Sequence, residues 1–477
     1  MNSSPTGPAL VLTTALRTAG LLGVLLGTSL IVGGCAHQAT TGEPKSASAS
    51  SGAGLSIPHE MYTLDNGLRV ILSEDHSSPY AHVEVWYRVG SKDERPGRSG
   101  FAHLFEHLMF QGSEHADGEY FAPLQAFGAD INGTTNRDRT NYFEKVPSHV
   151  LERALWMEAD RMGNLLPALT QEKLDNQREV VRNERRQNYE MRPYAVAQKA
   201  ISEAIYPVGH PYRHLTIGSH EDLQAATLDD VKAFFNEWYG PNNATLVVVG
   251  DIDVPQTKAW IQAFFGPLKS ITVGNEVRDV TVKPQPASTI VLEDRVSLPR
   301  VYLAWPSAPF FKPGDAALDV LSSVLSEGTS SRLQKSLVVE QKLASDVYAA
   351  QWSSLLGSTY NIIATAAPGV APEALAKAIQ AEIAKLTTTN QISNDEFDRA
   401  LNGWKKSYYG RLETVYGRAS SLQLYNYYLG TPNGLQTDLA RYSSLNAQAL
   451  TDEIQATLNP DYCQTIIVTP ANKGAAQ

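Results

Sequence analysis

Cysteine and clustered positive charge are both scarce in this sequence. Its 477 residues include only Cys35 and Cys463, and the formal net charge is −10 at pH 7. Two cysteines are too few for a disulfide framework. The acidic residues are scattered, and the one short basic cluster, at residues 182–186, is typical of a solvated helix face. We therefore predict no nucleic-acid partner.

The apolar run near the start, residues 21–32, is too short to span a bilayer permanently. It follows a single charged residue, Arg17, and ends at Val32-Gly-Gly-Cys35, which is the layout of a secretory signal. The site before Cys35 resembles a bacterial lipobox. By that resemblance, residues 1–34 are a lipoprotein signal peptide and Cys35 is lipidated, so that a lipid anchor is the only contact with a membrane. The alternative is an ordinary cleaved signal with an accidental cysteine.

The residues after the predicted signal have a different composition. Residues 35–56 are rich in Ser, Ala, Gly and Thr and predict a flexible tether. Ala36 gives no cue for retention in the inner membrane, which favours the outer one. A lipidated Cys35 leaves Cys463 without a disulfide partner, and the apolar run around Cys463 predicts that this thiol is buried.

The most informative motif is His103-Leu-Phe-Glu106-His107, in a chain with only 11 histidines. Residues 101–110 contain no Gly, Pro or β-branched residue and predict a helix, with Ser99 as its cap and Gly112 as its stop. At about 100° per residue, the apolar side chains gather on one side of this helix. His103, Glu106 and His107 share the opposite arc and are predicted to face away from the core.

The motif has the chemistry of a metal site. Two histidines four residues apart can hold one ion through neutral imidazole nitrogens, which suits Zn²⁺ best among the common metals. Glu106 can take a proton from a water whose pKa the ion lowers to about 7. The alternative is a solvated helix face with two incidental histidines.

A catalytic zinc usually has three protein ligands, so a third is missing from this motif. A helix is predicted from Gln171 onward, and its acidic side chains are the candidates. The residues alone do not choose among them: Asp175, Glu179, Glu184 and Glu190.

The chain has the length and the repeats of two domains. About 420 residues remain after the tether, which suits two domains of roughly 200 each. Residues 239–249 have a weak echo in residues 458–468: in both, a helical stretch leads through a proline turn into a β-branched strand. The alternative is a coincidence of a common helix-turn-strand unit.

The starts of the two halves also agree. Strands are predicted at 68–72 and 82–89, with counterparts at 289–292 and 301–305. We predict an α+β fold of two homologous domains, each with several helices against an antiparallel sheet. The predicted bounds are an N-terminal domain at 57–267, a linker at 268–287 and a C-terminal domain at 288–477.

The ordered motifs resemble those of the pitrilysin/insulinase metallopeptidases, specifically the short two-domain kind that includes mitochondrial processing peptidase. The resemblance covers about residues 60 to 470. The matching motifs are, in order, Gly100-Phe-Ala-His103-Leu-Phe-Glu106-His107-Leu-Met-Phe110 with Gly112-Ser113, Asn132-Gly133-Thr-Thr135 followed by Asn141-Tyr142, residues 178–186, and His210-Pro211-Tyr212 with Ile217-Gly218.

The resemblance implies roles that the residues alone leave open. It places the third zinc ligand at Glu184, 77 positions after His107, in an inverted-zincin arrangement with one zinc ion per chain. It makes the segment with Asn132 and Gly133 an edge strand that pairs with an extended substrate. A polar strand cap or turn is the alternative for Asn132.

One departure from the family pattern stands in the second half. Relatives and partner subunits carry an Arg and, seven residues later, a Tyr that contact the substrate carbonyl. This sequence has Val338 and Ser345 at those positions. We therefore predict the zinc-bearing subunit of a heterodimer, with a homologous partner subunit that supplies the Arg and the Tyr.

Together these features predict a zinc-dependent endopeptidase that hydrolyses peptides or unfolded segments at the periplasmic face of a bacterial envelope. One rival is a non-catalytic structural or assembly subunit, a role that relatives of this fold have in respiratory complexes. Such relatives usually lose the metal residues, which this chain keeps. Another rival is a lipoprotein that stores or delivers zinc.

Overall fold

The computed structural model of the chain describes residues 55–280, 282–389 and 391–471. The predicted signal peptide, Cys35 and the predicted tether up to residue 54 lie outside the described residues. Within the described ranges, no helix is both long enough and apolar enough to cross a membrane.

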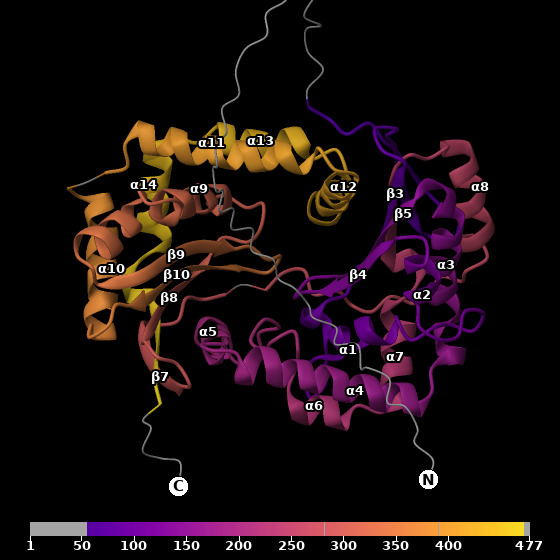
Figure 1. Cartoon of the computed structure of the whole chain (residues 1–477), viewed down its shortest axis with the longest axis horizontal. Coiled ribbons are helices and arrows are strands. Elements are labelled where there is room, and N and C mark those ends of the chain that lie inside the picture. Colours follow the sequence, from indigo (N-terminus) through magenta and orange to yellow (C-terminus); the bar gives the residue numbers. More distant parts are fainter. Residues whose placement is uncertain (1–54, 281, 390, 472–477) are drawn as a thin grey trace, which may run out of the picture. The chain divides into compact units, whose positions relative to one another are not determined.

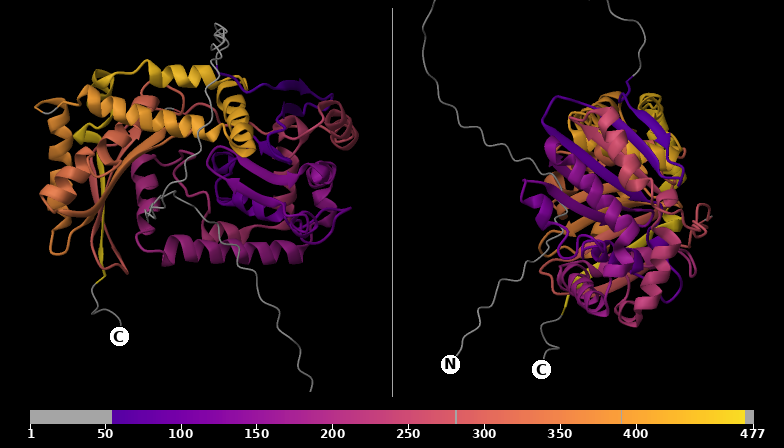
Figure 2. Two further views of the ribbon diagram at one scale, coloured as in Figure 1. Left: turned by 45° about the horizontal axis from the view of Figure 1, so that its top comes forward. Right: turned by 90° about the vertical axis from the view of Figure 1, so that its right-hand side faces the viewer.

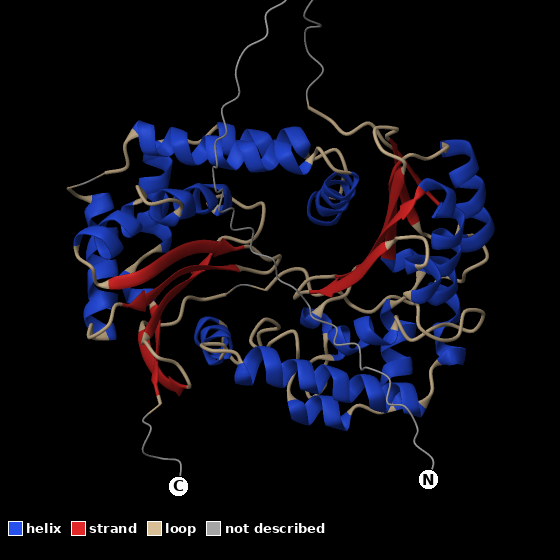
Figure 3. Cartoon of the chain, in the orientation of Figure 1, coloured by secondary structure: helices blue, strands red, loops and turns tan. Residues whose placement is uncertain are grey.

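The strands form two separate sheets, one from each half of the chain (Figure 3). The first has the order β1 (Glu60–Thr63), β2 (Arg69–Glu74), β6 (Ala244–Gly250), β3 (Tyr80–Tyr87), β5 (Thr140–Pro147) and β4 (Asp130–Thr135). The second has the order β7 (Ser288–Asp294), β11 (Gln464–Pro470), β8 (Arg300–Ser307), β10 (Ser358–Ala366) and β9 (Ala344–Trp352). The four strands predicted at the starts of the two halves are present as β2, β3, β7 and β8.

Several helices belong to each half, and those that pack on one face of each sheet enclose two large apolar cores. The helices of the first half are α1 (Phe101–Leu108), α2 (Ala122–Gln125), α3 (Leu151–Ala168), α4 (Gln171–Arg185), α5 (Val196–Ile205), α6 (His220–Ala225), α7 (Leu228–Trp238) and α8 (Val254–Phe265). Those of the second half are α9 (Asp315–Ser326), α10 (Pro372–Thr387), α11 (Asn394–Arg411), α12 (Val415–Leu429), α13 (Leu435–Ser443) and α14 (Ala447–Thr457). The predicted α+β fold of two like domains is confirmed. Cys463 is buried in the second core, as predicted.

The sequence echo corresponds to a repeated unit of structure. In the first half α7 leads through the 3₁₀ turn Pro241–Asn243 into β6, and in the second half α14 leads through Pro460–Tyr462 into β11. Each of these strands lies between two others in its sheet, parallel to one neighbour and antiparallel to the other. The sheets are therefore mixed, which corrects the prediction of purely antiparallel ones. A strand reached through a helical crossover can run parallel to its neighbour, whereas a hairpin cannot.

Each half also places one helix on the other half's sheet. α12 packs on β3 and β6 of the first sheet, and α5 packs on β7, β8 and β11 of the second (Figures 1 and 2). The contact of α12 is partly apolar, through Val247 and Val249 of β6. It is also polar, because the Gln423 amide donates hydrogen bonds to the backbone carbonyls of Glu84 and Thr245 at 3.1 and 2.8 Å. The two halves are thus joined through exchanged helices.

The start of α1 is held by a carboxylate that precedes it. Gly100 adopts φ +90° before the first turn, a conformation that glycine reaches without strain. The Glu94 side chain accepts hydrogen bonds from the amides of Gly100 and Ala102 at 2.9 and 2.8 Å. Ser99 instead donates its hydroxyl to Asp222. The predicted Ser99 cap is therefore wrong, because a buried carboxylate six residues upstream reaches the free amides first.

We expect Glu94→Ala to loosen α1, because it leaves two buried amides at the helix start without an acceptor. The free energy of unfolding should fall by about 1–2 kcal/mol, as for loss of a helix cap. Chemical denaturation followed by circular dichroism measures this. Glu119→Ala, which truncates an exposed glutamate, is the control and should change stability by less than about 0.5 kcal/mol. Equal stability of both variants would contradict the assignment of Glu94 as the cap.

Candidate metal centre

Helix α1 carries the two histidines and the glutamate of the motif, and their side chains are largely covered. His103 is 8% exposed and Glu106 6%. The predicted apolar stripe does pack in the core, but α4 covers the opposite, polar side of the helix. The sequence placed this polar side away from the core, and α4 covers it, since a short helix can be covered on two sides. This burial also rules out the alternative of a solvated helix face.

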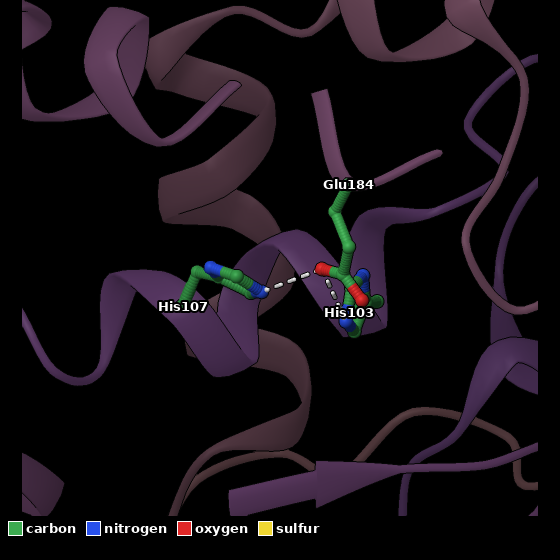
Figure 4. A group of neighbouring side chains, drawn as sticks. All are labelled: His103, His107 and Glu184. Atoms are coloured by element: carbon green, nitrogen blue, oxygen red, sulfur yellow. Dashed lines mark ion pairs between the residues drawn. The ribbon is translucent and has the colours of Figure 1, made fainter. Parts of the chain in front are cut away.

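The Glu184 side chain comes from α4 and points at both imidazoles (Figure 4). Its Oε2 lies 3.7 Å from Nε2 of His103 and 3.4 Å from Nε2 of His107. Among the described residues, this is the one group of three or more His, Cys, Asp or Glu side chains whose ligand atoms are close enough to share a metal ion, all within 4.8 Å of one another. The structure therefore brings together the three residues that the family resemblance selected.

The other acidic candidates on this segment face arginines instead. Asp175 pairs with Arg178 at 3.0 Å, Glu179 pairs with Arg182, and Glu190 pairs with Arg185 at 2.9 Å. Tertiary packing thus distinguishes Glu184 from its neighbours, which the residue pattern alone did not. The prediction that residues 182–186 form a solvated face is only partly correct.

Burial and neighbouring charges affect the two imidazoles in opposite directions. Burial lowers the pKa of His103, and the nearby His107 lowers it further. Burial also opposes protonation of His107, but the Glu184 carboxylate, 3.4 Å away, and the charge of Glu106 raise its pKa above the usual value. His103 is therefore held in the neutral form that metal coordination requires.

The donor set fits a zinc ion. Tetrahedral Zn²⁺ with bonds of about 2.0–2.2 Å keeps its ligand atoms about 3.4 Å apart. The 3.4 and 3.7 Å separations of the Glu184 oxygen from the imidazole nitrogens are close to this value. They are longer than the 2.7–2.9 Å of a charge-assisted hydrogen bond. Two imidazoles and one carboxylate are also ligand types that zinc accepts.

Two side chains that sequence reasoning missed contact the motif. Thr135, the last residue of β4, donates its hydroxyl to Oε2 of Glu106 at 2.5 Å. The Gln177 side chain, buried on α4, lies close enough to His107 to raise the pKa of that imidazole. A spacing of seven residues puts Gln177 and Glu184 on one face of the helix, and this spacing was the available signal. No comparable signal exists for Thr135, which reaches Glu106 from a strand.

β4 lies at the edge of the first sheet and passes beside Glu106. The Asn132 side chain is exposed and accepts a hydrogen bond from its neighbour's amide, Gly133 N, at 2.9 Å. Gly133 is buried, and a Cβ at this position would lie only 3.2 Å from Cγ of Glu106. A side chain here would therefore crowd the glutamate, which explains the glycine.

The two positions of the family departure lie on the second half. Val338 packs partly buried against the second core. Ser345, near the start of β9, donates its hydroxyl to the carbonyl of Ala366 at 3.4 Å. Neither side chain offers a guanidinium or a phenol.

Comparison with known proteins identifies the family. Residues 69–216 match Insulinase (Peptidase family M16), and residues 225–403 match the Peptidase M16 inactive domain. Zinc protease PqqE of Helicobacter pylori is 33% identical over 362 residues, which is 75% of this chain and 80% of that protein. The crystal structure of a protease from Helicobacter pylori superposes with a TM-score of 0.81 at 30% identity, covering 87% of this chain and 100% of that one.

A further solved structure shares the fold at lower identity. The periplasmic protease PqqL from Escherichia coli has a TM-score of 0.72 at 19% identity, over 87% of this chain and 48% of that chain. The chain belongs to peptidase family M16, the insulinase family. The resemblance inferred from the motifs is confirmed, and relatives of this chain are named zinc proteases.

If His103, His107 and Glu184 hold a metal, Glu184→Gln should lower the zinc content from about one ion per chain to nearly none. Glu179→Gln removes a carboxylate from the same helix, one that faces Arg182, and should leave the zinc content unchanged. Elemental analysis of the purified proteins measures both. Stoichiometric zinc in the Glu184 variant would contradict the site.

Proposed function

We propose that this chain is a zinc-dependent endopeptidase that hydrolyses peptides or unfolded protein segments held in extended form. The observation that carries the proposal is the convergence of Glu184 with His103 and His107 beside Glu106, inside the fold. Glu184, His103 and His107 would hold one Zn²⁺ per chain. When bound, zinc acts as a Lewis acid toward a carbonyl and lowers the pKa of water to about 7.

Glu106 is the proton carrier in this proposal. Its carboxylate accepts a proton from the water that attacks the scissile carbonyl, and it then passes that proton to the leaving amine. The hydroxyl of Thr135 and the absence of a side chain at Gly133 fix where this carboxylate lies. No covalent bond between substrate and protein is needed.

The edge strand β4 is the proposed substrate site. Along its free edge, backbone amides and carbonyls can pair with any peptide in strand form. Binding would therefore depend little on the side chains of the substrate. Asn132 and Gly133 are the residues of β4 that we assign to this contact. Gly133 also brings the backbone close to Glu106, as the reaction would require.

The second half lacks two groups that the reaction would need. With Val338 and Ser345 in place of Arg and Tyr, the described C-terminal half offers no preorganised donor at those positions for the developing oxyanion. We therefore propose that the chain is the catalytic subunit of a heterodimer. A homologous partner subunit would supply the Arg and the Tyr.

The proposed location is the periplasmic face of a bacterial envelope. Its support is the lipobox-like sequence that ends at Cys35, together with the periplasmic description of one structural relative. A lipid on Cys35 would be the anchor. We propose the outer membrane rather than the inner one as its location. We also propose the domain limits 57–267 and 288–477, with 268–287 as the linker and 35–56 as the tether.

The rival functions make different predictions. A structural or assembly subunit needs no metal, so zinc in the purified chain would argue against it. A lipoprotein that stores or delivers zinc would bind the metal without cleaving peptides. The placement of Glu106 beside the ligands and the edge strand favours the endopeptidase.

Glu106→Gln tests the proton carrier. The amide keeps the size of the side chain but cannot accept a proton, so peptide cleavage should fall by roughly 10²- to 10⁴-fold. The zinc content should stay at about one per chain, because Glu106 is not a proposed ligand. A fluorogenic peptide assay and elemental analysis measure the two quantities. Glu114→Gln, at an exposed position after the same helix, is the control, and normal turnover of the Glu106 variant would rule out this role.

The heterodimer is tested by purifying the native chain with and without its associated proteins. We expect a similar-sized homologue carrying the Arg and Tyr to co-purify. Missing oxyanion donors typically cost 10²- to 10³-fold in kcat, so the chain alone should be slower by about that factor. Full turnover by the isolated monomer or homodimer would contradict the proposal.

A further inference from the structure

The hydroxyl of Thr135 ties Glu106 to the edge strand. Thr135 Oγ1 donates to Oε2 of Glu106 at 2.5 Å, and the residue is only partly exposed. Successive side chains of a strand alternate between faces. Gly133 and Thr135 therefore both face α1, whereas the hydroxyl of Thr134 donates to Asn141 on the other face at 2.6 Å. A short bond to one oxygen sets the orientation of the whole carboxylate.

The strand that carries Thr135 is held at its C-terminal end, next to Thr135, by a buried aspartate. β4 and β5 form a hairpin, and Asp138 in its turn is 2% exposed. The Asp138 carboxylate accepts hydrogen bonds from the hydroxyls of Tyr212 and Tyr428 and from the amide of Leu355. Its backbone carbonyl accepts another, from the hydroxyl of Tyr427 at 2.7 Å.

Most of these donors belong to the second half of the chain. Tyr427 and Tyr428 lie on α12, and Leu355 lies in the turn between β9 and β10. By position in the two sheets, β9 and β10 are the counterparts of β4 and β5. The tips of two equivalent hairpins therefore meet at Asp138. The turn itself is braced by Asn136 Oδ1, which accepts hydrogen bonds from the amides of residues 138 and 139 at 2.7 and 2.9 Å.

We infer that Thr135 is a positioning residue for Glu106, and that Asp138 extends this link to the second half of the chain. The half that lacks the zinc motif then sets the orientation of the proton carrier through one hairpin. This inference rests on the proposed function for its effect on catalysis. The bond between Thr135 and Glu106 does not depend on it and is measurable in the folded protein alone.

Thr135→Val removes the hydroxyl and keeps the shape of the side chain. A lost hydrogen bond to a charged group should lower kcat by roughly 10- to 100-fold. KM should change by less than about threefold, because the bond orients a group that acts in the chemical step. Thr135→Ser keeps the hydroxyl and should restore most of the activity. Thr134→Val is the matched control, because it removes a hydroxyl from the same strand on the face away from Glu106.

Asp138→Asn tests the link to the second half. The amide of Asn cannot accept all the hydrogen bonds that the carboxylate accepts, so the hairpin tip should loosen and kcat should fall. If both residues act through the same hairpin, the double variant with Thr135→Val should be about as slow as the slower single variant. If the fall in kcat of the double variant equals the product of the two single falls, the two defects are independent. This result would overturn the Asp138 part of the inference.

A measurement without activity separates this inference from the proposed function. Thr135→Val and Glu106→Ala remove the same bond, so their effects on the thermal unfolding midpoint should be non-additive, whereas those of Thr134→Val and Glu106→Ala should add. Additive effects, or kcat of Thr135→Val equal to that of Thr134→Val, would overturn the inference. If the chain binds no zinc or cleaves no peptide even with its partner, the proposed function fails. The thermal unfolding midpoints still show whether Thr135 and Glu106 are hydrogen-bonded.

Discussion

The burial of ionisable side chains between α1, α4 and β4 is the constraint on which the rest of the structure depends. A charged group taken out of water must find a partner, because leaving it unpaired costs several kcal/mol. Here the carboxylate of Glu184 meets His103 and His107 at distances that suit a shared cation better than a direct hydrogen bond. Three side chains whose ligand atoms are close enough to share a metal ion are thus brought together by the packing of two helices.

The elements around this site keep it in place. Glu94 holds the start of α1, and Gln177 contacts His107 from the same face of α4 as Glu184. β4 approaches so closely that a Cβ at position 133 would lie 3.1 Å from the Phe110 ring and 3.2 Å from Cγ of Glu106. Few of these contacts are made by neighbours in the sequence, so the geometry of the site is a property of the assembled first half.

The two halves of the duplicated fold have different roles. Apart from the additional edge strand β1 of the first sheet, both halves have the same strand order, yet only the first carries the metal motif among the described residues. The second half contributes α12, which covers the first sheet, and the hairpin tip that meets Asp138. The half without the motif thus contributes contacts that support the first sheet and its β4–β5 hairpin.

The sequence by itself determined the fold class, the repeat, the His-x-x-Glu-His motif and the family, because these depend on periodicity and on the order of residue types. It did not determine that the polar side of α1 is buried, that Glu94 rather than Ser99 holds the helix start, or that each sheet contains a parallel pair. It left four carboxylates open as partners for the histidines until the resemblance singled out Glu184. The arginines that pair with Asp175, Glu179 and Glu190 are their near neighbours in the sequence. Only the tertiary structure brought Glu184 to the histidines of α1 and Thr135 to Glu106, because contacts between distant segments are set by packing and leave no local pattern.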